Sequence, residues 1–249
     1  MNNEKMVRLK KVEIEILDFV VDICNQNKIT YYLAYGTLLG AVRHKGFIPW
    51  DDDIDIVVPR ADYDELCRLL NTICNNACTS KFYFQNANTD LNFKRPYSKV
   101  RKRNTIFQES GEPCSNDQQG IFIDIFPLDT VRHQRGIQKL FSFFIFRLLH
   151  FRQKTDGICT SAANMMTTWY KKGNYYVVYG SPYKVEKDLH KKIWFENGTL
   201  VEFEGKQYNA PKDYDNYLKQ LYDDYMQLPP KDKRINHNPK VVEFGDVLE

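Results

Sequence analysis

The chain has 249 residues, of which 43% are hydrophobic and 27% charged, and its net charge is +3 at pH 7. A chain of this length can bury one large core, or a core with a substantial appendage. The near-neutral charge gives no reason to expect nucleic acid as a partner.

The first elements of the chain are predicted to be a helix, a strand and a second, shorter helix. Apolar residues recur at helical spacing over residues 5–27, and a strand-like run follows at residues 31–34. Residues 38–42 indicate a short helix behind Gly36 and Thr37. Free backbone amides at such a helix start face anions well, so Gly36 and Thr37 are candidate phosphate-binding residues.

The connecting loop over residues 43–50 is unusually basic and aromatic. Arg43, His44 and Lys45 bring three potential cations, which could face a diphosphate. Trp50 could lie under a base or a quaternary amine. A lone histidine in such a loop is more often a hydrogen-bonding group than a catalyst, so His44 is a binding candidate only.

Three consecutive aspartates, residues 51–53, lead into an apolar strand over residues 54–58. Alternate side chains of a strand share a face, so Asp53 and Asp55 are expected to point the same way. Two carboxylates this close raise each other's pKa, and a divalent cation such as Mg²⁺ (or Mn²⁺) is the usual relief. The alternative is a solvated turn, but Asp55 lies between apolar residues, where an unpaired carboxylate is costly.

The middle of the chain is predicted to alternate between helix and strand. A helix over 61–73 is followed by strands over 82–84, 97–101 and 121–126. Lys99 and Arg101 share one face of their strand, where they could balance phosphates or could blunt an exposed sheet edge. Asp124 is the only acid in the strand over 121–126, and Asp129 is expected to cap a following helix.

From about residue 133 the chain becomes helical and aromatic. Residues 140–151 predict a buried helix, or alternatively an interfacial helix at a membrane surface. Strands over 193–195 and 200–203, a hairpin turn and a helix over 212–226 precede an irregular tail. The change near residue 130 is the best candidate boundary between parts 1–130 and 131–249, which we expect to form one structural unit.

The stretch RHKGFIPWDDDIDI closely resembles the LicD family, and the C-terminal LPPKDKRINH is similar to that family's ending. The resemblance implies an α+β fold with a nucleotidyltransferase-like mixed sheet flanked by helices. It also implies that Asp53, Asp55 and Asp124 are the metal-binding and catalytic carboxylates. It places the strand of Lys99 and Arg101 in the core sheet, beside the metal strand. By the same resemblance, Arg234 and His237 fold back onto the donor phosphates.

The resemblance implies a metal-dependent transferase that moves a substituted phosphate, typically phosphocholine, from a CDP-linked donor such as CDP-choline and releases CMP. The acceptor is expected to be a hydroxyl of a cell-surface glycan or lipid-linked glycan, which would suit peripheral contact with the inner face of a membrane. Two alternatives stay open. One is a nucleotidyltransferase that uses a nucleoside triphosphate, and the other is a non-catalytic binding protein that retains the fold.

The six cysteines are interpreted as reduced residues of a cytoplasmic protein. The N-terminus lacks the apolar region of a secretory signal, and no apolar run reaches the roughly 20 residues of a membrane span. Cys74 and Cys78 are separated by three residues without a nearby histidine, which is weak as a zinc motif.

Overall fold

The structure is a computed structural model of the chain. It describes residues 2–76, 80–90, 92–108, 119–131, 140, 144, 173–181, 187–234, 236, 239 and 241–245.

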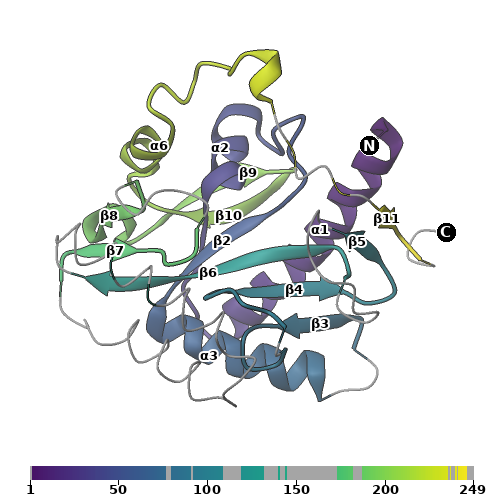
Figure 1. The fold of residues 1–249 in the computed structure, drawn as a ribbon. Coiled ribbons are helices and arrows are strands. Elements are labelled where there is room, and N and C mark those ends of the chain that lie inside the picture. Colours follow the sequence, from purple (N-terminus) through teal and green to yellow (C-terminus); the bar gives the residue numbers. More distant parts are fainter. Residues whose placement is uncertain are drawn as a thin grey trace.

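A mixed sheet forms the centre of the fold, with strands in the order β1-β2-β6-β4-β3 (Figure 1). Its strands are β1 (Tyr32–Leu33), β2 (Asp55–Pro59), β6 (Phe122–Val131), β4 (Ser98–Lys102) and β3 (Phe82–Gln85). β2 and β6 run parallel, whereas β1 with β2, β6 with β4 and β4 with β3 are antiparallel. The predicted α+β fold with a mixed sheet is confirmed.

The far half of β6 extends the sheet beyond the predicted strand end. It pairs with β7 (Tyr175–Val177), which pairs with β8 (Leu189–Lys191). The sheet therefore continues across the candidate boundary at residue 130. Asp129 was expected to cap a helix, and that prediction is wrong. It lies inside β6, fully buried, and accepts hydrogen bonds of 2.6 and 2.8 Å from the Arg60 guanidinium, which stabilises its charge.

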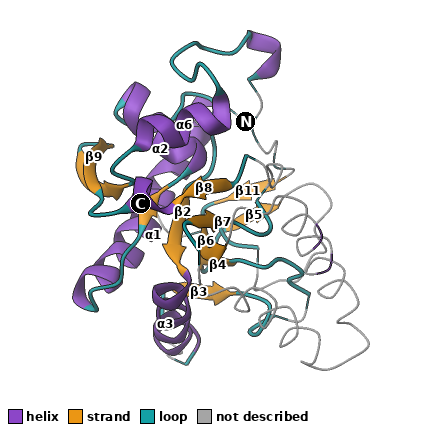
Figure 2. Ribbon diagram, turned by 90° about the vertical axis from the view of Figure 1, so that its left-hand side faces the viewer, coloured by secondary structure: helices purple, strands orange, loops and turns teal. Residues whose placement is uncertain are grey.

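Two helices, α1 (Asn3–Gln26) and α3 (Arg60–Leu70), cover one face of the sheet (Figure 2). The apolar positions of α1, among them Leu9, Val12 and Ile16, are buried, as their helical spacing predicts. The Asn2 side chain caps the helix by accepting from the Lys5 amide at 2.9 Å. A π-helical turn over Asn71–Asn75 continues α3.

The remaining elements surround the end of the sheet where β2 begins. They are α2 (Tyr35–His44), the hairpin of β9 (Thr199–Phe203) and β10 (Lys206–Ala210), and α6 (Tyr214–Tyr222). Residues 193–195 are not a strand as predicted but part of a 3₁₀ turn, η3 (Lys192–Phe195). The Lys192 amide and the Trp194 carbonyl hydrogen-bond to loop residues Asn174 and Asp213, instead of pairing with a strand.

The C-terminal tail is more regular than expected. After Pro230 it forms a 3₁₀ turn, η4 (Lys231–Lys233), and later β11 (Val241–Glu243), which pairs with β5 (Ile106–Gln108). The polar segment before residue 119 and the predicted apolar helix over 140–151 fall largely outside the described residues. In that helix only Leu140 and Phe144 are described, both helical and exposed. None of the helices in the described part of the chain is long and apolar enough to cross a bilayer.

Candidate functional site

Three charged side chains form a row across neighbouring strands of the sheet. In the strand register Asp55 of β2 is paired with Asp124 of β6, and Asp124 is paired with Lys99 of β4. Paired residues on adjacent strands project from the same face. All three are buried, with 9%, 8% and 2% of their surfaces exposed for Asp55, Asp124 and Lys99. The predicted proximity of Asp55 and Asp124 is thus present in the fold.

Lys99 supplies an internal cation for this row. Its Nζ lies 3.3 Å from Asp124 Oδ1 and 3.2 Å from the centroid of the Phe122 ring. Burial, then the charges of Asp53 and Asp124, holds the pKa of Asp55 well above its usual range, while Lys99 acts in the opposite direction. The row therefore has more negative charge than one lysine balances, which favours a further cation.

The start of α2 is fitted closely against the aspartates. Thr37 Oγ1 accepts a hydrogen bond of 2.8 Å from the Asp55 amide, which ties α2 to β2. A Cβ atom on Gly36 would lie 2.6 Å from Asp51 Oδ2, so a larger residue at this position would displace the Asp51 carboxylate. The Thr37 side chain is engaged with β2 and does not line the adjoining cavity, whereas Gly36 does.

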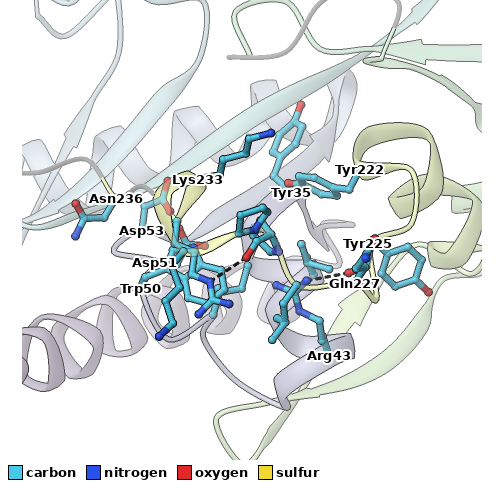
Figure 3. A pocket seen from close by; sticks show the side chains of 18 of the residues that line it. Tyr35, Arg43, Trp50, Asp51, Asp53, Tyr222, Tyr225, Gln227, Lys233 and Asn236 are labelled. Atoms are coloured by element: carbon cyan, nitrogen blue, oxygen red, sulfur yellow. Dashed lines mark hydrogen bonds between the residues drawn. The ribbon is translucent and has the colours of Figure 1, made fainter.

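A cavity of about 1100 Å³ opens in front of this helix start (Figure 3). Asp51, Asp53 and Asp55 contribute acidic groups to its lining. Four basic residues line the cavity, and three of them belong to the C-terminal tail: Arg43, Lys231, Lys233 and Arg234. Its aromatic lining residues are Tyr35, Trp50, Tyr222 and Tyr225. The cavity thus combines carboxylates with cations, an arrangement suited to a ligand that carries phosphates and, through a metal, meets the acids.

Trp50 and Arg234 meet at this cavity, but in an arrangement that the sequence did not predict. The Arg234 guanidinium lies 4.7 Å from the centroid of the Trp50 ring. Arg234 Nε also donates to the Pro229 carbonyl at 3.1 Å, which links two residues of the same tail segment. The Trp50 ring, which was expected to bind an amine of the ligand, is therefore already in a cation–π contact with Arg234.

The three cations of the predicted loop are divided by the fold. Arg43 and His44 belong to the last turn of α2, and only Arg43 lines the cavity. Arg43 Nη1 donates to the Tyr225 carbonyl at 2.8 Å and Arg43 Nε donates to His44 Nε2 at 3.0 Å. Burial lowers the pKa of His44, and Arg43 acts in the same direction. Lys45 ends the helix in a left-handed conformation and does not line the cavity.

The basic strand lies inside the sheet, with β6 and β3 on its two sides, so it is not an edge strand. The basic strand was expected to lie beside β2, the strand of Asp55. It lies instead beside β6, the strand of Asp124. Arg101 is buried and donates to Gln85 Oε1 at 2.6 Å and to the Gly120 carbonyl at 2.9 Å. Neither Lys99, Arg101 nor Asp124 lines the cavity, and His237 lies outside the described residues.

Two of the aspartates that line the cavity, Asp51 and Asp53, belong to a cluster that fits a hard divalent cation. Carboxylate oxygens of Asp51, Asp52 and Asp53 lie within 4.8 Å of one another, and all donors are oxygen, the ligand type that Mg²⁺ prefers. The predicted ligand set was Asp53, Asp55 and Asp124, so Asp53 is common to both groups. The sequence analysis missed Asp51 as a site residue, although the run of three aspartates contained the signal. It also missed Lys231 and Lys233, which lie in the basic ending that it had singled out.

Residues 28–138 match the family described as LicD/FKTN/FKRP, nucleotidyltransferase domain. Residues 28–138 form a LicD-family domain. The predicted family is therefore confirmed. The chain is 27% identical to the lipopolysaccharide cholinephosphotransferase LicD of Haemophilus influenzae, over 90% of this chain and 92% of that protein. It is 47% identical to the uncharacterized protein RP689 of Rickettsia prowazekii, over 20% of this chain and 18% of that protein.

The LicD domain supplies only part of the cavity. It contains the row of Lys99, Asp124 and Asp55 together with α2. The basic groups of η4 and the tyrosines of and after α6 lie beyond residue 138. The cavity is completed by the C-terminal part of the chain.

Proposed function

We propose that this protein is a LicD-type phosphotransferase that moves phosphocholine from CDP-choline to a hydroxyl of a surface glycan or lipid-linked glycan. The observation that carries the proposal is the register pair of Asp55 and Asp124, set beside a cavity lined by both acids and bases. The similarity to a lipopolysaccharide cholinephosphotransferase over nearly the whole chain supports the same reaction class.

The arrangement of charges in the cavity supports a diphosphate donor. Arginine can hold a phosphate through two parallel hydrogen bonds, and lysine through a point charge. Arg43, Lys231 and Lys233 would bind and orient the donor's phosphate oxygens. Asp53 and Asp55, with Asp51 beside them, would hold Mg²⁺ or Mn²⁺. A bound divalent cation would neutralise charge on the diphosphate and on the departing CMP.

The reaction exchanges one phosphorus–oxygen bond for another. The acceptor hydroxyl oxygen attacks the phosphorus that bears choline, a new phosphodiester bond forms, and the bond to CMP breaks. The hydroxyl proton must pass to a base, and Asp124 is the proposed acceptor of that proton or a further metal ligand. Lys99, whose Nζ lies 3.3 Å from Asp124 Oδ1, would orient that carboxylate.

Phosphorus NMR of the protein with CDP-choline, Mg²⁺ and a mixed glycan acceptor tests the proposal directly. We expect CMP to appear with wild-type protein and metal, and to be lost in Asp53→Asn. Asp64→Asn is the matched control, because Asp64 is an exposed aspartate on α3 that does not line the cavity. Equal CMP release by wild type and Asp53→Asn would refute the assigned role of the carboxylates.

The family description also names a nucleotidyltransferase domain, so release of pyrophosphate from nucleoside triphosphates is the second candidate activity. Pyrophosphate without CMP from CDP-choline would favour it. CMP from a CDP-linked donor with ethanolamine, glycerol, or a sugar or polyol phosphate would keep the reaction and change the head group. No turnover with any donor would favour a non-catalytic binding protein.

The proposed place of action is the cytoplasm, with peripheral contact at the inner face of the membrane where a lipid-linked acceptor would lie. Vesicle flotation with and without a lipid-linked glycan tests this contact. Protein that stays unbound under both conditions would contradict it.

A further inference from the structure

A buried carboxylate, Asp188, lies behind the cavity and takes no part in the chemistry described above. It is fully buried, and a buried charge is costly unless hydrogen-bond donors surround it. The Tyr35 hydroxyl donates to Asp188 Oδ1 at 2.9 Å, and the Ser181 hydroxyl donates to Asp188 Oδ2. His190 Nε2 is 3.5 Å from Asp188 Oδ1. Two hydroxyl groups and one imidazole therefore surround the charge.

Gln220 contacts His190 on the side of the ring away from Asp188. Gln220 Nε2 donates to the carbonyls of Lys187 and Leu189 at 2.7 and 3.1 Å and lies 3.1 Å from His190 Nδ1. The other ring nitrogen, Nε2, is the one that lies 3.5 Å from Asp188 Oδ1. The hydrogen bonds to Asp188 come from the hydroxyls of Tyr35 and Ser181.

Ser181, His190 and Asp188 do not form a nucleophilic triad. In such a triad the serine hydroxyl bonds to the imidazole, whereas here Ser181 bonds directly to the carboxylate. Asp188 and His190 are also fully buried. The role of Asp188, Ser181 and His190 must therefore lie in the residues that they contact.

Asp188 contacts Tyr35, which is the first residue of α2. Tyr35 lines the cavity, and its φ of +44° lies in the left-handed region, which is strained for a residue with a side chain. Its backbone amide donates to the Tyr217 hydroxyl at 3.4 Å, and the Tyr217 ring lies 4.5 Å from that of His190. The same cluster thus holds both the phenol and the backbone of Tyr35. Gly36 and Thr37, which follow at once, are the residues that approach Asp51 and Asp55.

We propose that Asp188 is a positioning residue that acts through the Tyr35 hydroxyl to keep the first turn of α2 in its strained conformation against the aspartates. The inference rests on the proposed function, since that turn faces the donor phosphates. Burial, with the charge of Asp188 as the next cause, holds the pKa of Tyr35 well above its usual range, so the hydroxyl remains a donor.

Two substitutions separate positioning from simple stability. Tyr35→Phe removes a hydroxyl donor from Asp188, whereas Tyr32→Phe removes a buried tyrosine hydroxyl that donates to the Phe195 carbonyl at 2.7 Å and does not line the cavity. We expect both to lower the melting temperature. We expect only Tyr35→Phe to lower kcat, by about tenfold or more, with the donor KM changed by less than about threefold. Equal losses of kcat in the two variants would overturn the proposal.

A double-mutant cycle tests whether Asp188 acts through Tyr35. Asp188→Asn should lower kcat in the wild-type background and have no further effect in the Tyr35→Phe background. Independent, multiplying effects would contradict action through the hydroxyl. Asp188→Asn keeps the size of the side chain, which favours retention of the fold.

Amide hydrogen exchange gives a readout that does not depend on activity. Without substrate, residues 35–40 should exchange about tenfold faster in Tyr35→Phe and Asp188→Asn than in wild type or Tyr32→Phe. Unchanged exchange in both variants would overturn the positioning role. If wild type shows no turnover with CDP-choline, the proposed function fails, while the exchange result still decides the role of Asp188.

Discussion

Replacing Lys99 by methionine removes the internal cation of the carboxylate row while keeping most of the side-chain volume. Lys99 Nζ lies 3.3 Å from Asp124 Oδ1, and Lys99 is almost fully buried. With an effective dielectric constant of about 20, Coulomb's law gives an attraction of about 5 kcal/mol at that distance. Desolvation of the lysine offsets part of this, but the variant leaves Asp124 and Asp55 facing each other. We expect a loss of about 3–5 kcal/mol in unfolding free energy.

Urea unfolding measures this loss, and added Mg²⁺ tests its cause. A ligand at 100 times its dissociation constant stabilises a protein by about 2.7 kcal/mol. In the proposed site Lys99 would compete with a metal for Asp124 and repel it, so Mg²⁺ should stabilise the variant more than wild type. Lys102→Met is the matched control on the same strand. Lys102 is also buried, but its partner Glu15 is 41% exposed and can be hydrated once the lysine is removed, so the loss should be smaller than in Lys99→Met.

Two outcomes would refute this account of the row. One is a loss below about 1 kcal/mol in Lys99→Met, because a removed partner of a buried charge should cost more. The other is an equal loss in the two lysine variants. An unchanged effect of Mg²⁺ would show instead that no metal binds next to Lys99.

Further predictions concern other closely packed or buried groups. Gly36→Ala places a Cβ where Asp51 Oδ2 would be 2.6 Å away, and the displaced carboxylate should lower turnover by about tenfold to a hundredfold, measured as CMP release; unchanged turnover would contradict the close fit. Asp129→Asn leaves the Arg60 guanidinium without its buried partner and should cost about 3–5 kcal/mol in urea unfolding; a cost below about 1 kcal/mol would contradict the buried pair. Burial raises the pKa of the Cys24 thiol to about 12, so iodoacetamide at pH 8 should label it only after unfolding, as read by mass spectrometry. Because an unfolded thiol ionises near pH 8.5, the unfolded chain loses this proton first, and Cys24 should lower stability as pH rises from about 8.5 to 12.

Local patterns were sufficient for the elements whose residues carry their own signal. The helical spacing of α1 and the apolar runs of β2 and β6 each predicted the observed element. The alternation of a strand also predicted that Lys99 and Arg101 share a face. A short apolar run does not distinguish a strand from a turn. Residues 193–195 were predicted to be a strand for this reason but form part of a 3₁₀ turn. Asp129 resembles a helix cap, but it lies within β6, where Arg60, the residue after the neighbouring strand β2, binds its carboxylate.

The sequence by itself determined the LicD family, the mixed α+β fold and the carboxylates most worth testing, because these depend on residues close together in the chain. Only the tertiary structure decided which charges meet. It aligned Asp55, Asp124 and Lys99 in one row through strand register, which no local spacing encodes. It brought the tail to the cavity, so that Arg234 covers Trp50, and it joined Tyr35 to Asp188 across 153 positions of sequence. Such contacts depend on how distant elements pack, and therefore appear only in the folded chain.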